Sequence, residues 1–160
     1  MRLVPLAAAL LAVALPAAGQ SHPSLAGTWV LDASKSTVDG PIPLPSAETD
    51  IVTQRGDTID VDVKSTTDVG EIAIKRTFAV DGKAWPNVMT YQGTDMQLSS
   101  VLVWKEAVLS IETTTDFQGT PVEQSETWTP SADGKTLTVM VTTNVSGAYF
   151  ASVTKVYNKK

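Results

Sequence analysis

The chain has 160 residues, of which 17 are acidic and 12 basic, so its net charge is −5, and it contains no cysteine. The negative charge argues against nucleic acid and anionic membrane surfaces as partners, and the lack of cysteine excludes disulfides and a thiol nucleophile. A chain of this length can bury a core of its own as one domain.

Residues 1–19 have the composition of a secretory signal peptide. Arg2 precedes an apolar run over 3–15, and the small residues Ala17-Ala18-Gly19 predict cleavage after Gly19. The run is shorter than the roughly 20 apolar residues that a membrane-spanning helix needs. We therefore expect an exported protein, periplasmic or secreted, with a flexible mature N-terminus at 20–26 and a single barrel domain over 27–158.

A proline-rich segment at 33–47 follows the first predicted strand. It contains Gly40, Pro41, Pro43 and Pro45, and prolines at alternate positions exclude a helix because each lacks an N–H and restricts the residue before it. We expect an extended loop laid over one end of the domain.

From residue 48 onward, glycines arrive at nearly even intervals, which is typical of short strands joined by hairpins. They are Gly56, Gly70, Gly82, Gly93, Gly119, Gly134 and Gly147. No stretch after the leader keeps a helical apolar period for three turns. The pattern predicts ten strands: 27–32, 48–54, 58–64, 71–80, 84–90, 96–105, 107–116, 122–129, 136–143 and 149–158.

Apolar and polar residues alternate within these strands, which assigns them to two faces. Ile59, Val61 and Val63, for example, oppose Asp60 and Asp62. A core on one face and a polar surface on the other predict an all-β, closed or nearly closed antiparallel up-and-down barrel of eight to ten strands. Closure requires residues 28–31 to pair with the final strand around 153–157, and a Greek-key sandwich is the alternative. The polar outer face argues against insertion into a membrane.

Gly27-x-Trp29 at the start of the first strand resembles the motif that opens the barrel of the lipocalins and the wider calycin group. In those proteins the tryptophan packs across the closed end of the barrel. The stretches 31–36 (LDASKS) and 126–139 (ETWTPSADGKTLTV) are similar to a group of exported bacterial lipocalin-like proteins of uncharacterised function. The resemblance covers most of the chain and implies a barrel around a cavity, with Trp29 buried at one end.

Two details depart from the lipocalin pattern. Residues 115–117 (Thr-Asp-Phe) are loosely similar to the Thr-Asp-Tyr motif at the closed end of true lipocalins, but the tyrosine is missing. The chain also has no arginine after Arg76 to cover Trp29 as the lipocalin arginine does. We expect Lys155 or Lys159 to replace it as a cation over the ring.

Arg76 is the most informative candidate residue, because it shares an inward face with Phe78. An unpaired charge inside would cost several kcal/mol, and Gln124 and Glu126 lie on one face of a strand that can supply a partner. Arg76 and Glu126 then form an internal ion pair, or a β-bulge turns Arg76 to water. In the competing interpretation Arg76 anchors a ligand carboxylate or phosphate.

The predicted function is the binding of a small, mostly apolar molecule inside the barrel, acidic if Arg76 is its anchor. The candidate contacts are Arg76, Phe78, Trp104, Gln124 and Glu126. The alternative is a filled barrel that serves as a structural or interaction module of the cell envelope. An enzyme with Glu126 or Tyr149 as general acid or base is a third, less favoured hypothesis.

Metal and nucleophile chemistry find little support in the sequence. His22 is the only histidine and precedes Pro23 in the mature N-terminus, where we expect a disordered tail, and Asp60 and Asp62 alternate with apolar residues on an outward face. Without cysteine and with no other histidine, neither a zinc site nor a catalytic triad is expected. We predict no cofactor, and the sequence leaves the oligomeric state open.

Overall fold

The computed structural model describes residues 22–68, 70–91 and 94–160, so the predicted leader lies outside the described part of the chain. Glycine-containing turns separate the strands of this part much as the sequence predicts. Its elements are β1 (Gly27–Leu31), a 3-10 turn η1 (Ala33–Lys35), β2 (Thr37–Asp39), β3 (Ala47–Arg55), β4 (Thr58–Thr67), β5 (Gly70–Ala79), β6 (Ala84–Tyr91), β7 (Thr94–Lys105), β8 (Val108–Phe117), β9 (Thr120–Pro130), β10 (Thr136–Val145) and β11 (Ala148–Lys159). None of the described helices is long and apolar enough to cross a membrane.

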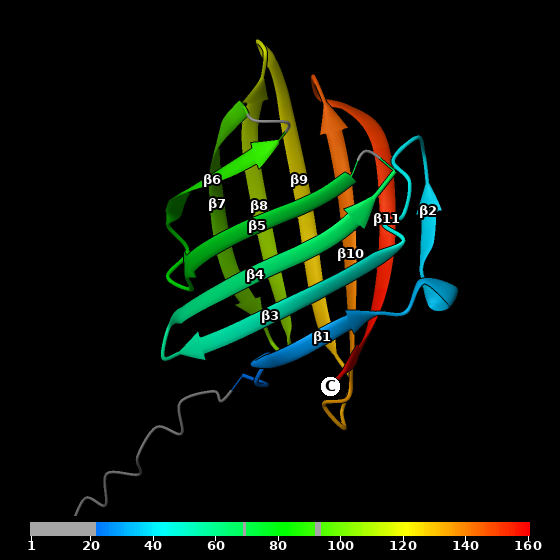
Figure 1. Cartoon of the computed structure of the whole chain (residues 1–160). Helices are drawn as coiled ribbons and strands as arrows, with labels where there is room; N and C mark the ends of the chain where they lie inside the picture. The colour runs from blue at the N-terminus through cyan, green and yellow to red at the C-terminus, as the bar shows by residue number, and fades with distance from the viewer. Residues whose placement is uncertain (1–21, 69, 92–93) are drawn as a thin grey trace, which may run out of the picture.

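The strands form one antiparallel sheet that curls into a nearly closed barrel (Figure 1). Neighbours follow chain order, and β1 pairs with β11 to join the two ends of the meander, with Trp29 opposite Lys159 and Leu31 opposite Tyr157. The predicted barrel is thus confirmed and the sandwich alternative is wrong. The closing register lies slightly further along the last strand than predicted.

The barrel is open between β5 and β6, where the order of paired strands begins and ends. One side chain crosses this gap: the Thr77 N–H donates to Asn87 Oδ1 at 2.9 Å, and Asn87 Nδ2 donates to the Thr77 carbonyl at 3.2 Å. Pro86 is tolerated in β6 because one edge of that strand lacks a ladder partner. In the described part of these two strands, the Asn87 amide therefore links backbones that form no ladder with each other.

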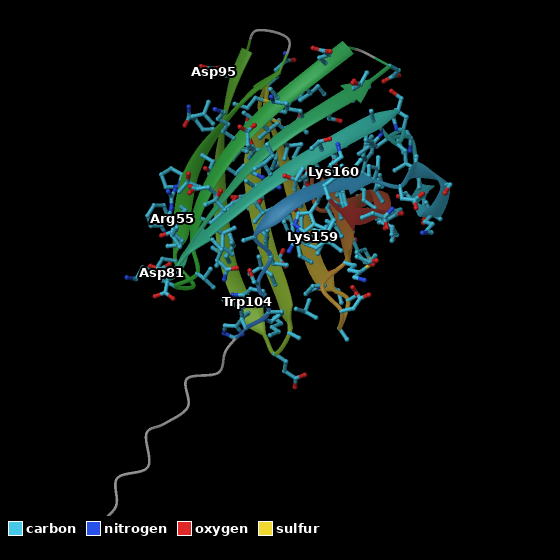
Figure 2. The ribbon with its side chains drawn as sticks, turned by 60° about the horizontal axis from the view of Figure 1, so that its bottom comes forward. Arg55, Asp81, Asp95, Trp104, Lys159 and Lys160 are labelled. Carbon is cyan, nitrogen blue, oxygen red and sulfur yellow. The ribbon has the colours of Figure 1, made fainter. Side chains whose placement is uncertain are left out.

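Trp29 closes one end of the barrel. It is fully buried, and its indole Nε1 donates to the Leu25 carbonyl at 2.8 Å. Lys159 Nζ lies 5.0 Å from the ring centroid, which confirms the predicted replacement of the lipocalin arginine. Trp104 lies at this end as well, whereas Asp95 lies at the other (Figure 2). Residues 115–117 end β8 at the end opposite Trp29, so their loose similarity to the closed-end lipocalin motif does not extend to their place in the barrel.

Gly27 explains why the motif before Trp29 needs a glycine. Its φ is 145°, and a Cβ at this position would clash with Lys159 Cε. The Lys159 side chain thus packs directly against Gly27, and this position lets its ammonium group lie over the Trp29 ring.

The proline-rich segment forms no α-helix, as predicted. After η1, β2 pairs with β11 through Val38 and Val153, an additional short strand that the sequence analysis missed. Gly40 then passes so close to β11 that a Cβ would lie 2.8 Å from the Phe150 carbonyl oxygen. Beyond it the chain turns over the barrel, where Pro45 is buried.

The predicted inward residues form the core. Those with the lowest exposure include Ile59, Val61, Phe78, Leu102, Leu109, Ile111, Trp128, Leu137 and Tyr157. They pack together with Trp29 at its end of the barrel. A cavity occupies the interior toward the opposite end.

Candidate functional site

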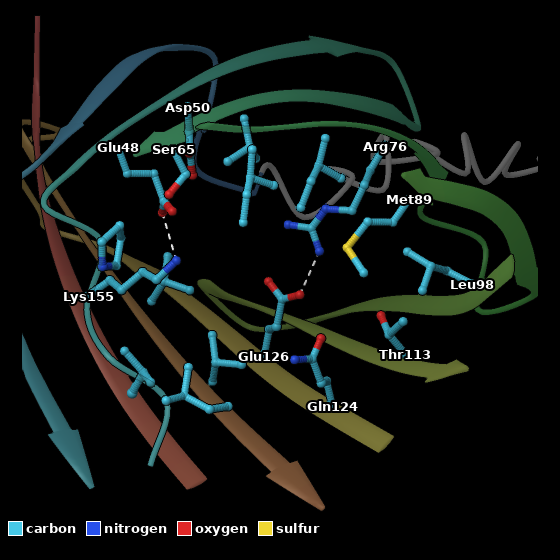
Figure 3. A pocket seen from close by; sticks show the side chains of 18 of the residues that line it. Glu48, Asp50, Ser65, Arg76, Met89, Leu98, Thr113, Gln124, Glu126 and Lys155 are labelled. Atoms are coloured by element: carbon cyan, nitrogen blue, oxygen red, sulfur yellow. Dashed lines mark hydrogen bonds and ion pairs between the residues drawn. The ribbon is translucent and has the colours of Figure 1, made fainter. Parts of the chain in front are cut away.

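A cavity of about 500 Å³ lies inside the barrel (Figure 3). Much of its wall is apolar and comes from most strands of the sheet and from the proline-rich segment. The apolar lining residues include Ile42, Pro43, Pro45, Val63, Ile72, Ile74, Met89, Met96, Leu98, Phe117, Val122, Val139, Val141 and Val153. Polar side chains gather against this wall in two groups, one around Arg76 and one around Glu48.

Arg76 and Glu126 form the first group. Arg76 Nη1 donates to Glu126 Oε1 at 2.6 Å, and their side chains are 14% and 7% exposed. Trp128 Nε1 donates to the second oxygen, Glu126 Oε2, at 2.9 Å. Burial alone would raise the pKa of Glu126, but Arg76 and then Trp128 outweigh it and lower the pKa. The guanidinium also lies 5.3 Å from the centroid of the Phe78 ring.

Glu48 and Lys155 form the second group, together with Tyr157. Lys155 Nζ donates to Glu48 Oε1 at 2.7 Å, and the Tyr157 hydroxyl donates to the same oxygen. Burial raises the pKa of Tyr157 far above its ordinary value, with the nearby Asp50 and Glu48 charges adding to the effect. Tyr157 therefore acts as a neutral hydrogen-bond donor to a charged carboxylate.

Asp50 lies beside these pairs without joining either. It is 3% exposed and lines the cavity, and its Oδ1 has no hydrogen-bond partner among the described residues. Burial, helped by repulsion from Glu48, raises the pKa of Asp50 to about 7, while Lys155 and Arg76 act in the opposite direction. This carboxyl changes its protonation state near neutral pH.

Three of the five predicted ligand contacts meet at the cavity, namely Arg76, Gln124 and Glu126. Phe78 is fully buried in the core and lies outside the cavity lining, where it supports the Arg76 guanidinium from the side. Trp104 also lies outside the lining. The bulge that would turn Arg76 outward is absent, because β4 and β5 pair without a register shift from Thr58 to Thr67.

Trp104 instead stacks against the imidazole ring of His22. The two rings are stacked with centroids 4.8 Å apart, and His22 Nδ1 lies 3.1 Å from the Glu106 carbonyl oxygen. This contact, which the sequence did not predict, ties the start of the described chain to the β7–β8 hairpin.

Glu48, Asp50 and Lys155 are cavity residues that the sequence analysis missed. A signal for them exists, since Glu48 and Asp50 share the strand face of Val52, and Lys155 that of Val153 and Tyr157. The apolar members of each face point inward, so the charged members of the same face must do so too.

The two alternative acid–base candidates lie in different environments. Glu126 is buried in its ion pair, whereas Tyr149 is 55% exposed and its hydroxyl donates to Asp39 Oδ2 at 2.7 Å. Among the described residues, no group of three or more acidic or histidine side chains is placed to hold a metal ion.

No protein-family model matches the chain, and neither does the sequence of any curated protein. Among solved structures, fatty-acid-binding protein 1 of Echinococcus granulosus is similar, with a TM-score of 0.53 and 16% identity over 84% of this chain and 96% of that one.

Secretory abundant heat soluble protein 4 of Ramazzottius varieornatus has a TM-score of 0.50 and 12% identity over 84% of this chain and 94% of its own. Zebrafish ileal bile acid-binding protein, complexed with cholic acid, has a TM-score of 0.49 and 16% identity over 85% and 98% of the two chains. At these identities the likeness shows the fold alone. The chain therefore has a nearly closed antiparallel barrel of the same kind as the Echinococcus fatty-acid-binding protein.

Proposed function

We propose that this protein is an exported binding protein that holds one small, mostly apolar molecule inside its barrel. The observation that carries the proposal is the cavity of about 500 Å³, walled by aliphatic and methionine side chains with a few buried polar groups. Its size falls in the range of about 300–1,000 Å³ that is usual for sites of small ligands. A filled structural barrel, the alternative function, would leave no such space.

The similar structures support the proposal at the level of fold. The Echinococcus protein is by name a fatty-acid-binding protein, and its barrel covers most of this chain. The same type of barrel thus belongs to a protein named for binding fatty acids. Which ligand the present protein binds is determined by the residues that line its own cavity.

Native mass spectrometry of the protein purified from its own host tests the proposal directly. We expect a bound small molecule that leaves on denaturation, and a rise in melting temperature with members of a lipid and metabolite panel. At a ligand concentration of 100 times Kd the stabilisation amounts to about 2.7 kcal/mol. A protein that arrives empty and shows no shift with the panel would favour the filled-barrel alternative.

Two tryptophan variants provide a matched comparison for this experiment. Ile74→Trp fills the cavity from its wall, whereas Ile51→Trp adds the same bulk on the outer face, where Ile51 is 44% exposed. We expect the inner variant to lose the ligand-induced shift and the outer variant to keep it. Equal shifts in both variants would place binding outside the cavity.

Export and a bacterial origin are further parts of the proposal, and residues 1–19 support them through their signal-peptide composition. Expression of the full chain in a bacterial host, followed by fractionation and intact-mass measurement, tests the export. We expect a periplasmic or secreted product that begins at Gln20. A cytoplasmic product that retains Met1 would contradict it.

A further inference from the structure

We propose that the polar end of the ligand is a hydrogen-bond-donating cation, such as a primary ammonium group, which Asp50 receives inside the cavity. The inference rests on the proposed function, because it assigns the chemical class of the molecule that the same cavity holds. It is based on the number of charged side chains that line the cavity and on which of them form ion pairs with each other.

The charged side chains of the described cavity lining are unequal in number. Three are carboxyls, Glu48, Asp50 and Glu126, and two are cations, Arg76 and Lys155. Each cation is already paired, Arg76 with Glu126 at 2.6 Å and Lys155 with Glu48 at 2.7 Å. One buried carboxyl, that of Asp50, therefore remains without a counter-charge.

Asp50 also lacks the hydrogen bonds that a buried carboxyl requires. The residue is 3% exposed, and no described residue donates a hydrogen bond to its Oδ1. A buried polar atom without a partner costs free energy, and unmatched groups of this kind gather at functional sites. A ligand ammonium supplies both missing components, a charge and N–H donors.

An acidic ligand, which one of the two interpretations of Arg76 from the sequence implied, fits the lining poorly. A ligand carboxylate would be a fourth negative group beside two cations that are both occupied, and it would have to displace Glu126 or Glu48. Within the described part of the chain Arg76 Nε has no partner either, but Glu126 already neutralises the guanidinium charge. A neutral acceptor on the ligand is sufficient there.

Three probes with the same ten-carbon chain separate these cases: n-decylamine, n-decanol and decanoate. Their dissociation constants are measured by isothermal titration calorimetry at pH 8, below the critical micelle concentrations. We expect decylammonium to bind most tightly and decanoate least tightly. Decanoate binding as tightly as decylammonium would overturn the inference while leaving the proposed function intact, and the absence of binding for all three probes would overturn both.

Asp50→Asn tests the residue itself, with Asp62→Asn as its control. Asp62 lies on the outer face, 34% exposed and 3.6 Å from Lys75, so its replacement changes the net charge equally without touching the cavity. We expect Asp50→Asn to weaken decylammonium roughly tenfold to a hundredfold, the effect of losing a charged hydrogen bond, and to leave decanol unchanged. Unchanged decylammonium affinity in Asp50→Asn would overturn the assignment.

The wild-type protein provides a readout that needs no variant. Glu48 from the same strand, Lys155 and Tyr157 from β11, Arg76 from β5 and Glu126 from β9 are the charged or titratable groups that act on Asp50. Because Asp50 gives up its proton near pH 7, decylammonium affinity should rise about tenfold from pH 6 to pH 8. A decylammonium affinity that stays constant or falls over this range would overturn the inference, because it would show that the ionised form of Asp50 does not receive the ammonium group.

Discussion

At the scale of single residues, the Arg76–Glu126 pair shows how a charge is kept inside the barrel. Both side chains are largely removed from water, and Glu126 has a second donor in Trp128. Such a pair adds little net stability compared with apolar residues of the same size. Its members nevertheless depend on each other, because either one alone would be a buried charge without a partner.

Arg76→Met should therefore lower the free energy of unfolding by about 3–5 kcal/mol, since it leaves Glu126 charged and buried. The double variant Arg76→Met with Glu126→Gln should recover much of the loss. Urea denaturation of both variants and of the wild type measures this. Lys75→Met is the control, because Lys75 is 83% exposed on the outer face of the same strand. An effect of Arg76→Met no larger than that of Lys75→Met would contradict the buried pair.

Gly27→Ala should cost about 1–3 kcal/mol, because alanine resists the positive φ of this position and its Cβ would displace Lys159 from the Trp29 ring. Near-ultraviolet circular dichroism of the tryptophans and thermal unfolding both report the change. Gly56→Ala is the comparison, since φ is also positive there but no atom lies within 4 Å of the added Cβ. The prediction fails if the two variants unfold alike with unchanged spectra.

At the scale of elements, alternation within each strand locates most of the barrel in the sequence. It works because inner and outer positions differ sharply in polarity, as Ile59 and Asp60 do. It also places Arg76 and Glu126 on inner faces. It cannot show that they meet, since 50 residues separate them and their contact depends on the curvature of the whole sheet.

Alternation within strands also could not predict the gap between β5 and β6, because the gap depends on contacts between distant strands. Asn87 reaches across it with one amide, and nothing in the local pattern distinguishes this asparagine from one that hydrogen-bonds to water. The three residues of β2 escaped prediction as well, because they become a strand only by pairing with β11.

Asn87→Ala should destabilise the protein by about 2–3 kcal/mol, since two hydrogen bonds are lost and the Thr77 N–H is left without a partner. Amide hydrogen exchange at Thr77 should accelerate in parallel. Asn87→Asp retains the acceptor and removes only the donor, so its Thr77 amide should stay better protected than in Asn87→Ala. An unchanged exchange rate at Thr77 in Asn87→Ala would mean that the Asn87 side-chain amide does not stabilise the edge of β5.

At the scale of the whole molecule, Asp50 makes stability depend on pH. Burial and Glu48 raise its pKa to about 7 in the folded protein, whereas the unfolded chain has an ordinary aspartate. Below about pH 4 both states hold the proton. From about pH 4 to pH 7 only the folded state holds it, so the free energy of unfolding falls as the pH rises and levels off above about pH 7.

Asp50→Asn removes this dependence. We expect the variant to exceed the wild type in the free energy of unfolding by on the order of 3–4 kcal/mol at pH 8 and to match it near pH 4. Chemical denaturation across this range measures the difference, with Asp62→Asn as the control that should follow the wild type. A constant difference between variant and wild type at every pH would show that Asp50 does not titrate in the folded protein.

The closure of the barrel also sets the order in which the molecule is assembled. Asn158 Nδ2 donates to Asp32 Oδ2 although 126 residues separate them, and Lys160 N donates to the Thr28 carbonyl beside them. Pairings this distant in sequence form slowly, because the loop must close before they contribute. At a synthesis rate of about 5–20 residues per second, the strand that covers Trp29 is made on the order of ten seconds after it, and export as proposed would extend this interval until the chain has crossed the membrane. In that interval its indole is exposed, and the nascent chain is open to chaperones.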